Sequence, residues 1–115
     1  MAIAVIYCRT ASGTSSEITE QLAKQESACR KLAERLGYEV VATFQDHASG
    51  NGSDRPGLRD MLSFLESGTA PLAAVLVKDH ARIAREPAQY LQIADAVQAA
   101  SGTIVSASDD PSEPA

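Results

Sequence analysis

Four arginines are the residues of this sequence best suited to chemistry. Arg9, Arg55, Arg82 and Arg85 fall in polar segments that follow short apolar runs. An arginine side chain presents a planar fork of donors that matches phosphate oxygens, and it stays charged when partly buried. Because arginines that meet at one point repel one another unless an anion lies between them, the pattern favours a phosphoryl or phosphodiester ligand. The other interpretation makes them surface residues in salt bridges with the acids Asp46, Asp54, Asp79 and Glu86.

Familiar phosphate-binding patterns are missing from the sequence. It has no G-x-x-x-x-G-K-[ST] loop and no G-x-G-x-x-G after its first apolar run. A cysteine-phosphatase loop needs an arginine several residues after its cysteine, whereas Arg9 follows Cys8 directly. A small-anion or nucleotide binder that uses the same arginines stays open as a further function class.

The other titratable residues predict no site. Asp79 and His80 could form an acid–base pair, but adjacent side chains often point apart. Both are therefore interpreted as solvated loop residues, and so is His47. Cys8 and Cys29 are too few for a disulfide framework and lack zinc-ligand spacing, which predicts buried free thiols and no metal site.

The composition is that of one ordinary globular domain. The chain has 115 residues, of which 44% are hydrophobic and 22% charged, within the usual range for a single domain. Its net charge of −5 argues against a protein that wraps nucleic acid non-specifically, because such binding depends on neutralising phosphates. No apolar run approaches the ~18 residues of a membrane span, and no secretory signal opens the chain, so we expect a cytoplasmic location.

Strand-like and helix-like segments alternate along the chain. The predicted strands are Ala2–Tyr7, Tyr38–Phe44, Ala73–Val77 and Thr103–Ala107. The predicted helices run from Ile18 to Leu36, with Ser15 or Ser16 as cap and Gly37 as stop, from Pro56 to before Gly68, and from Pro87 to near Gly102. This alternation predicts an α/β three-layer domain over residues 1–108, with a mainly parallel four-stranded sheet flanked by helices. Residues 109–115 are predicted to form a disordered acidic tail.

The predicted sheet gives the arginines a common location. Open parallel sheets bind their ligands at the carboxyl ends of the strands. The first three predicted strands end in the segments that hold the four arginines. We therefore expect Arg9, Arg82 and Arg85 to converge, with Arg55 at the margin, in a cationic pocket that the acidic average conceals.

Six stretches of the sequence form a recognisable set, in order and with compatible spacings. They are Ile6–Arg9, Gln25–Arg30, Phe44–Gly50, Ser53–Leu58, Val75–Lys78 and Arg82–Arg85. Together they resemble the motifs of the serine recombinases, the resolvase/invertase family, over about Ile3 to Asp110. The most specific are the Asp-x-x-Ser-Gly…Asp-Arg-x-Gly-Leu loop and the Arg-x-x-Arg pair.

The resemblance implies cleavage and rejoining of DNA strands without a metal or cofactor. In the family, a serine hydroxyl attacks the scissile phosphodiester and leaves a 5′-phosphoserine link and a free 3′-hydroxyl, so rejoining needs no ATP. Matched position by position, the phosphate-site arginines are Arg9, Arg55, Arg82 and Arg85, and the further phosphate- or DNA-binding residues are Gln25, Asp46, Ser49 and Lys78.

The nucleophile position departs from the family pattern. Two residues after Arg9, where the family has its serine, this sequence has Ala11, and the nearest hydroxyls are those of Thr10 and Ser12. Either Ser12 serves as the nucleophile, or the chain is an inactive resolvase-like module that acts through protein or DNA contacts. Both alternatives stay open.

A second departure is Ala81, which stands where the Asp-Arg-Leu-x-Arg motif has its acid. Asp79 lies two residues early and is not assumed to replace it. Without the acid, we expect Arg82 and Arg85 to be less constrained and the pocket to be more cationic.

The family pattern also continues past the fourth strand. It goes on into a long helix that forms the dimer and then into a DNA-binding domain, and this sequence contains neither. We therefore expect the chain alone to bind DNA weakly and without sequence preference. Its expected protein partner is a second copy or another recombinase.

Overall fold

Four parallel strands form the sheet in the computed structural model, which describes residues 2–10, 14–47, 56–67, 72–84 and 86–109. The elements are β1 (Ala2–Thr10), α1 (Ser15–Leu36), β2 (Tyr38–His47), α2 (Pro56–Glu66), β3 (Leu72–Val77), the 3-10 turn η1 (His80–Arg82), α3 (Pro87–Ala99), β4 (Thr103–Ser106) and the 3-10 turn η2 (Ala107–Asp109). The strand order is β2-β1-β3-β4, with parallel pairing throughout. The predicted α/β fold with a parallel four-stranded sheet is confirmed.

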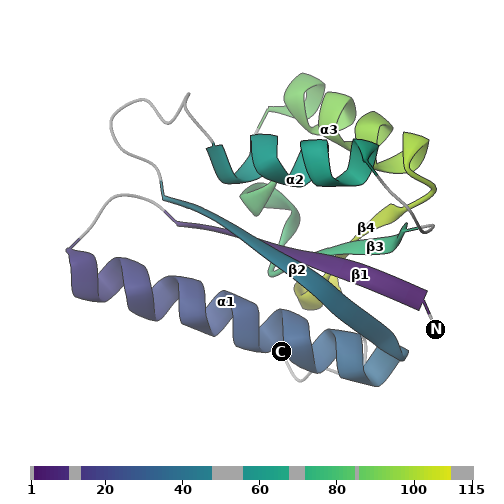
Figure 1. The fold of residues 1–115 in the computed structure, drawn as a ribbon. Coiled ribbons are helices and arrows are strands. Elements are labelled where there is room, and N and C mark those ends of the chain that lie inside the picture. Colours follow the sequence, from purple (N-terminus) through teal and green to yellow (C-terminus); the bar gives the residue numbers. More distant parts are fainter. Residues whose placement is uncertain (1, 11–13, 48–55, 68–71, 85, 110–115) are drawn as a thin grey trace.

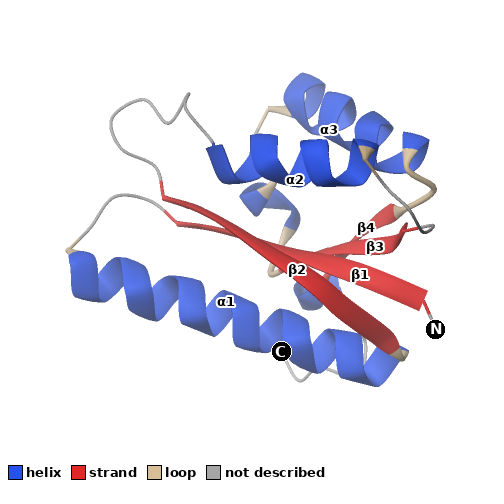
Figure 2. Ribbon diagram, in the orientation of Figure 1, coloured by secondary structure: helices blue, strands red, loops and turns tan. Residues whose placement is uncertain are grey.

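Helices cover both faces of the sheet. Figure 1 and Figure 2 show α1 on one face and α2 with α3 on the other. The segment Ala4–Cys8 in the centre of β1 is fully buried because both faces are covered. Its side chains alternate between two cores: Val5 and Tyr7 pack toward α2 and α3, whereas Ile6 and Cys8 pack against α1.

The start of α1 differs from the prediction. Thr14 caps the helix, and the prediction of Ser15 or Ser16 is wrong. Thr14 and Glu17 form a reciprocal capping box, in which Thr14 Oγ1 accepts from the Glu17 amide and the Thr14 amide donates to the Glu17 carboxylate, both at 3.2 Å. At the other end, Gly37 has a φ of +78° and is the left-handed C-cap that the sequence predicts.

The strands β1 and β2 run past their predicted ends, to Thr10 and His47. The extension follows from parallel pairing, in which Arg9 lies beside Asp46 and Thr10 beside His47. Polar residues that look like loop in the sequence are therefore strand residues. This places Arg9 on a strand, where its main chain has a fixed course.

The end of the described chain also differs slightly from the prediction. The strand β4 stops at Ser106, because Ala107–Asp109 form η2. Of the tail expected at 109–115, only Asp109 lies within the described residues. In the part of the chain that the structure describes, no helix has the length and apolar character needed to cross a bilayer.

Candidate functional site

The end of β1 is held in place by α1. Ile6 is the last β1 residue paired with β3. Beyond it β1 stays paired with β2 as far as Thr10, and the side-chain amide of Gln25 adds two hydrogen bonds. The Arg9 amide donates to Gln25 Oε1 at 3.0 Å, and Gln25 Nε2 donates to the Arg9 carbonyl at 2.8 Å. Gln25 is only 2% exposed, so this pair of bonds, the Gln25 clamp, is made by a buried side chain. The clamp fixes the main chain from which the Arg9 side chain projects.

Arg82 reaches the same point from the turn after β3. Its Nη1 donates to the Arg9 carbonyl at 3.3 Å, and its Nε lies 3.5 Å from Asp79 Oδ2. Both arginines are partly buried. The structure thus brings the Arg82 guanidinium to the main chain of Arg9. Asp79 and the β1 carbonyl both contact the Arg82 guanidinium, and the expectation that Arg82 is less constrained than in the family stays a prediction.

Asp46, near the end of β2, is buried and accepts three hydrogen bonds. The Tyr7 hydroxyl donates to Oδ2 at 2.7 Å, and the amides of Gly57 and Leu58 donate at 2.8 and 2.9 Å. Because Pro56 has no N–H, these are the first amides that α2 offers, and Asp46 caps the helix from the neighbouring strand. A Cβ on Gly57 would collide with the β2 main chain. Asp46 therefore fixes where α2 begins at this end of the sheet.

The turn η1 is braced by α3. The Tyr90 hydroxyl lies 2.8 Å from His80 Nδ1, and the two rings meet edge to face with centroids 5.6 Å apart. Both side chains are partly buried. The interpretation of His80 as a solvated loop residue is therefore wrong, whereas Asp79 precedes the turn and its side chain is 35% exposed. The two adjacent side chains do point apart, since one contacts Arg82 and the other Tyr90.

The other predicted site residues lie apart from this cluster or outside the described chain. Lys78 is exposed just after β3, and its carbonyl accepts from Ser106 Oγ at 3.2 Å and from the Ser108 amide at 3.0 Å. Its main chain is thus tied to the β4 side of the sheet. The residues outside the described ranges are Ser12, Ser49, Arg55 and Arg85. That the side chains of Arg9, Arg82 and Arg85 converge, with Arg55 at the margin, stays a prediction.

The two cysteines are buried free thiols, as predicted. Burial raises the pKa of Cys8 to about 12, and the Glu26 carboxylate adds to the rise. Burial also raises the pKa of Cys29 to about 12, with the Cys8 thiol as the next cause. A thiol that stays protonated at neutral pH is a poor nucleophile, so neither one stands in for a serine. Across the described ranges, the His, Cys, Asp and Glu side chains form no group of three or more that could hold a metal ion.

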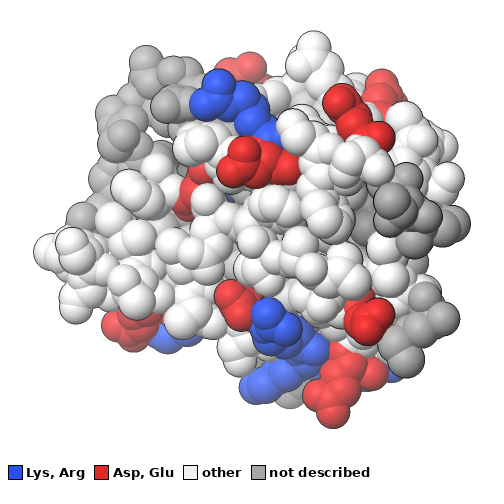
Figure 3. All heavy atoms as spheres, viewed as in Figure 1, with Lys and Arg blue, Asp and Glu red and all other residues white. Residues whose placement is uncertain are grey.

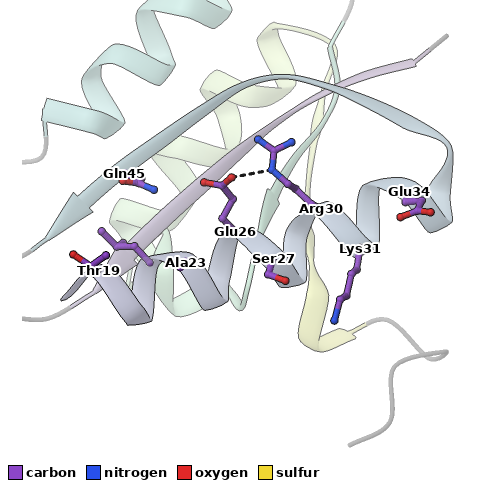
Figure 4. Close-up of a pocket in the computed structure, with 9 residues that line it drawn as sticks. Thr19, Ala23, Glu26, Ser27, Arg30, Lys31, Glu34 and Gln45 are labelled. Carbon is purple, nitrogen blue, oxygen red and sulfur yellow. Dashed lines mark hydrogen bonds and ion pairs between the residues drawn. The ribbon is translucent and has the colours of Figure 1, made fainter. Parts of the chain in front are cut away.

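A groove of about 530 Å³ runs along α1 beside the edge strand β2 (Figure 4). In it, Glu26 pairs with Arg30 at 2.8 Å, and Arg30 Nη2 donates to Thr43 Oγ1 at 3.4 Å. Figure 3 shows the same mixture over α1, where Lys and Arg are flanked by Asp and Glu. None of the predicted site residues lines the groove. Its opposite charges compensate one another, so the groove is not the expected cationic pocket.

In the sequence, Asp79 is one of four acids that could form salt bridges with the arginines, and the structure pairs it with Arg82. The pair has a local signal, since an acid and an arginine three residues apart meet in a single helical turn. The contacts of Tyr7 with Asp46, of His80 with Tyr90 and of Gln25 with the Arg9 main chain were not predicted. They join residues of different elements, and no spacing in the sequence indicates them.

Comparison with known proteins gives a consistent result. The family model for the resolvase N-terminal domain matches residues 4–115. The C-terminal catalytic domain of ISC1926 TnpA, an IS607-like serine recombinase, is 28% identical, with a TM-score of 0.76 over 93% of this chain and 70% of that one. A resolvase family site-specific recombinase from Streptococcus pneumoniae is 26% identical, with a TM-score of 0.72 over 96% and 77%. The N-terminal catalytic domain of TP901-1 integrase shares the fold at 24% identity, with a TM-score of 0.74 over 92% and 77%.

Proposed function

Since the chain belongs to the resolvase family and is a serine recombinase catalytic domain, we propose that it cleaves and rejoins DNA strands by phosphodiester transfer. The proposal goes beyond family membership, because it assigns the chemistry to residues of this chain. Its strongest support is the hydrogen bond of 3.3 Å from Arg82 to the Arg9 carbonyl. The contact supports the proposal because it lies near the carboxyl end of β1, where parallel sheets bind their ligands.

Ser12 is the proposed nucleophile. Its Oγ forms a bond to phosphorus while the bond from phosphorus to the 3′ oxygen breaks. The serine hydroxyl gives up its proton, and the departing 3′ oxygen takes one up. The product is a 5′-phosphoserine link and a free 3′-hydroxyl, and attack by another 3′-hydroxyl reverses the step. The link retains the energy of the phosphodiester, so the reaction requires no ATP.

Arg9 and Arg82 are proposed to hold the phosphate, joined by Arg55 and Arg85. Phosphoryl transfer spreads negative charge over the oxygens of the transition state, and donors fixed in advance stabilise that charge without reorganising. The Gln25 clamp supports this role, because it fixes the main chain at Arg9 with two hydrogen bonds from a buried side chain.

The remaining predicted site residues receive less direct roles. Gln25 and Asp46 act through the main chains of β1 and α2, which they hold in place. Ser49 and Lys78 are proposed to contact the DNA backbone. The partners of the chain are DNA and either a second copy of the chain or another recombinase.

Ala11 supports a second candidate function. With no hydroxyl at the family's nucleophile position, the chain could be a module that binds a DNA phosphate through the same arginines and leaves it intact. The two functions share a ligand and differ in whether a covalent bond to DNA forms.

The experiment joins the chain to a dimerisation helix and DNA-binding domain of the family and looks for protein–DNA adducts in denaturing gels. We expect an adduct from the parent chain and none from Ser12→Ala. Thr10→Val removes the other nearby hydroxyl with little change of shape, and it should keep the adduct. An adduct that survives Ser12→Ala shows that the nucleophile is wrong. Binding of the duplex without any adduct favours the second function.

A further inference from the structure

The turn that carries Arg82 begins with an aspartate that does not cap it. Asp79 is the N-cap residue of η1, with φ −153° and ψ 165°, and its side chain makes no capping hydrogen bond. An aspartate in that position ordinarily accepts from the amides of the turn. Here the carboxylate lies against Arg82, with 3.5 Å between Asp79 Oδ2 and Arg82 Nε. The carboxylate thus contacts the guanidinium in preference to the turn.

The main chain of the turn explains this pairing. The Arg82 amide donates to the Asp79 carbonyl at 3.1 Å, and residues three apart lie one above the other in 3-10 geometry. Asp79 Oδ1 is shielded from solvent and has no hydrogen-bond partner among the described residues. The arginine is therefore the main compensation for the hydration that the carboxylate has lost.

Two contacts fix the plane of the Arg82 guanidinium. Its Nε lies 3.5 Å from Asp79 Oδ2 in an ion pair that is not a hydrogen bond, and its Nη1 donates to the Arg9 carbonyl. Because the guanidinium is planar, contacts at two of its nitrogens set the direction in which the whole group presents its donors. The bond between His80 and Tyr90 ties the same turn to α3, so the base of the side chain is also held.

We propose that Asp79 is a positioning residue that orients the Arg82 guanidinium toward the bound phosphate, in place of the acid that the family pattern has at Ala81. The inference rests on the proposed function only for the identity of the ligand. Asp79 acts through Arg82 and transfers no proton. Position 81 can therefore lack an acid while Arg82 keeps a carboxylate partner.

The first test follows the Arg82 Nε–H signal in a ¹H–¹⁵N spectrum of the chain, assigned by its loss in Arg82→Lys. Asp79→Asn keeps the shape of the side chain and removes its charge. We expect this variant to shift the signal and to speed its exchange with water. The matched control is Glu20→Gln, which removes the exposed ion pair of Glu20 with Lys24 on α1 and should leave the signal unchanged. An unchanged Arg82 signal in Asp79→Asn overturns the proposal.

The second test titrates both variants with inorganic phosphate. Each variant makes the net charge less negative by one unit, which by itself strengthens anion binding slightly. We nevertheless expect Asp79→Asn to weaken phosphate binding by about fivefold, because the guanidinium loses its orientation, and Glu20→Gln to stay within about twofold. Equal or tighter binding by Asp79→Asn contradicts a positioning role. Matching urea midpoints for both variants would show that the fold is intact.

A third test separates this proposal from the proposed function. The joined recombinase is given DNA in which sulfur replaces the 3′ bridging oxygen, so that the leaving group needs no proton. A positioning residue predicts that the Asp79→Asn defect persists on this substrate. Full recovery would make Asp79 a proton donor and overturn the proposal. If no variant forms an adduct, the proposed cleavage fails, while the Arg82 signal and the phosphate titration still decide the role of Asp79.

Discussion

Arg82 contacts the main chain of Arg9, but the two arginines are held in opposite ways. Arg9 is fixed through its main chain by the neutral, buried amide of Gln25. Arg82 is fixed through its side chain by an ion pair with Asp79, in which the side chains are 32% and 35% exposed. Salt screens a partly exposed ion pair far more than a buried neutral hydrogen bond. One arginine is therefore positioned by the stability of the core, and the other by an electrostatic contact that can change without unfolding.

The largest effect is expected from Gln25→Ala. The change leaves the partly buried Arg9 amide without its acceptor and opens a cavity beside β1, so we expect a loss of about 3 kcal/mol in the free energy of unfolding. Urea denaturation measures it, and the loss should be the same at low salt and at about 1 M salt. Gln92→Ala, at an exposed position of α3, is the control and should cost less than about 0.5 kcal/mol. Equal losses in the two variants would show that the clamp contributes no stability.

A smaller effect comes from pH, because the cysteines lie beside the clamp. Cys8 precedes Arg9, and Cys29 is one helical turn beyond Gln25. Burial raises both thiol pKa values from 9.0 to about 12. Below pH 9 the thiols are protonated in both states, and above it only the unfolded chain ionises, so stability falls as the pH rises toward 12.

At about pH 10 we expect a loss of about 1 kcal/mol for each thiol relative to about pH 8. Urea midpoints at the two pH values measure it. Replacing both Cys8 and Cys29 by alanine should remove this part of the fall. If the double variant loses as much stability as the parent, other groups cause the change, and the core beside the clamp is less closed than the structure shows.

Tyr90→Phe probes the other arginine and should have a more modest effect. It removes the hydroxyl that contacts His80 and keeps the ring, so we expect a loss of about 1 kcal/mol and a broader Arg82 Nε–H signal. Tyr38→Phe is the control, because the Tyr38 hydroxyl makes no hydrogen bond to the described residues. A sharp, unshifted Arg82 signal in Tyr90→Phe would show that α3 does not brace the turn.

The same comparison shows what the sequence can predict. The spacing of apolar residues predicts the centres of the strands and the buried faces of the helices. These elements predict the fold, and the fold puts Arg9 and Arg82 at the same edge of the sheet. The spacing of apolar residues does not predict the strand ends. Arg9 and Asp46 are polar, and they are strand residues only because they pair with each other. Local chemistry recognises an acid near an arginine, but only the 3-10 geometry shows that Asp79 faces Arg82.

Gln25 illustrates the same limit in the core. Its position in the apolar stripe of α1 predicts burial, and the structure agrees. Its partner is the main chain of Arg9, sixteen residues earlier. A backbone group carries no residue-specific signal in a sequence, so burial is predictable here and the contact is not.

The smallest effect is expected at position 81, where restoring the family's acid should leave adduct formation unchanged. Ala11→Ser restores a hydroxyl at the family's nucleophile position, and we expect it to raise adduct formation by the joined recombinase about tenfold or more, since a misplacement of 1 Å can cost ~100-fold. Adding Ala81→Asp should bring no further gain. Asp79 already contacts Arg82 Nε, and a second carboxylate would compete for the same guanidinium while making the pocket less attractive to an anion. In an Asp79→Asn background, by contrast, Ala81→Asp should recover part of the lost activity. Adduct yields from these chains decide the matter, and a clear gain from Ala81→Asp with Asp79 intact would mean that the ion pair at 3.5 Å does not replace the family's acid.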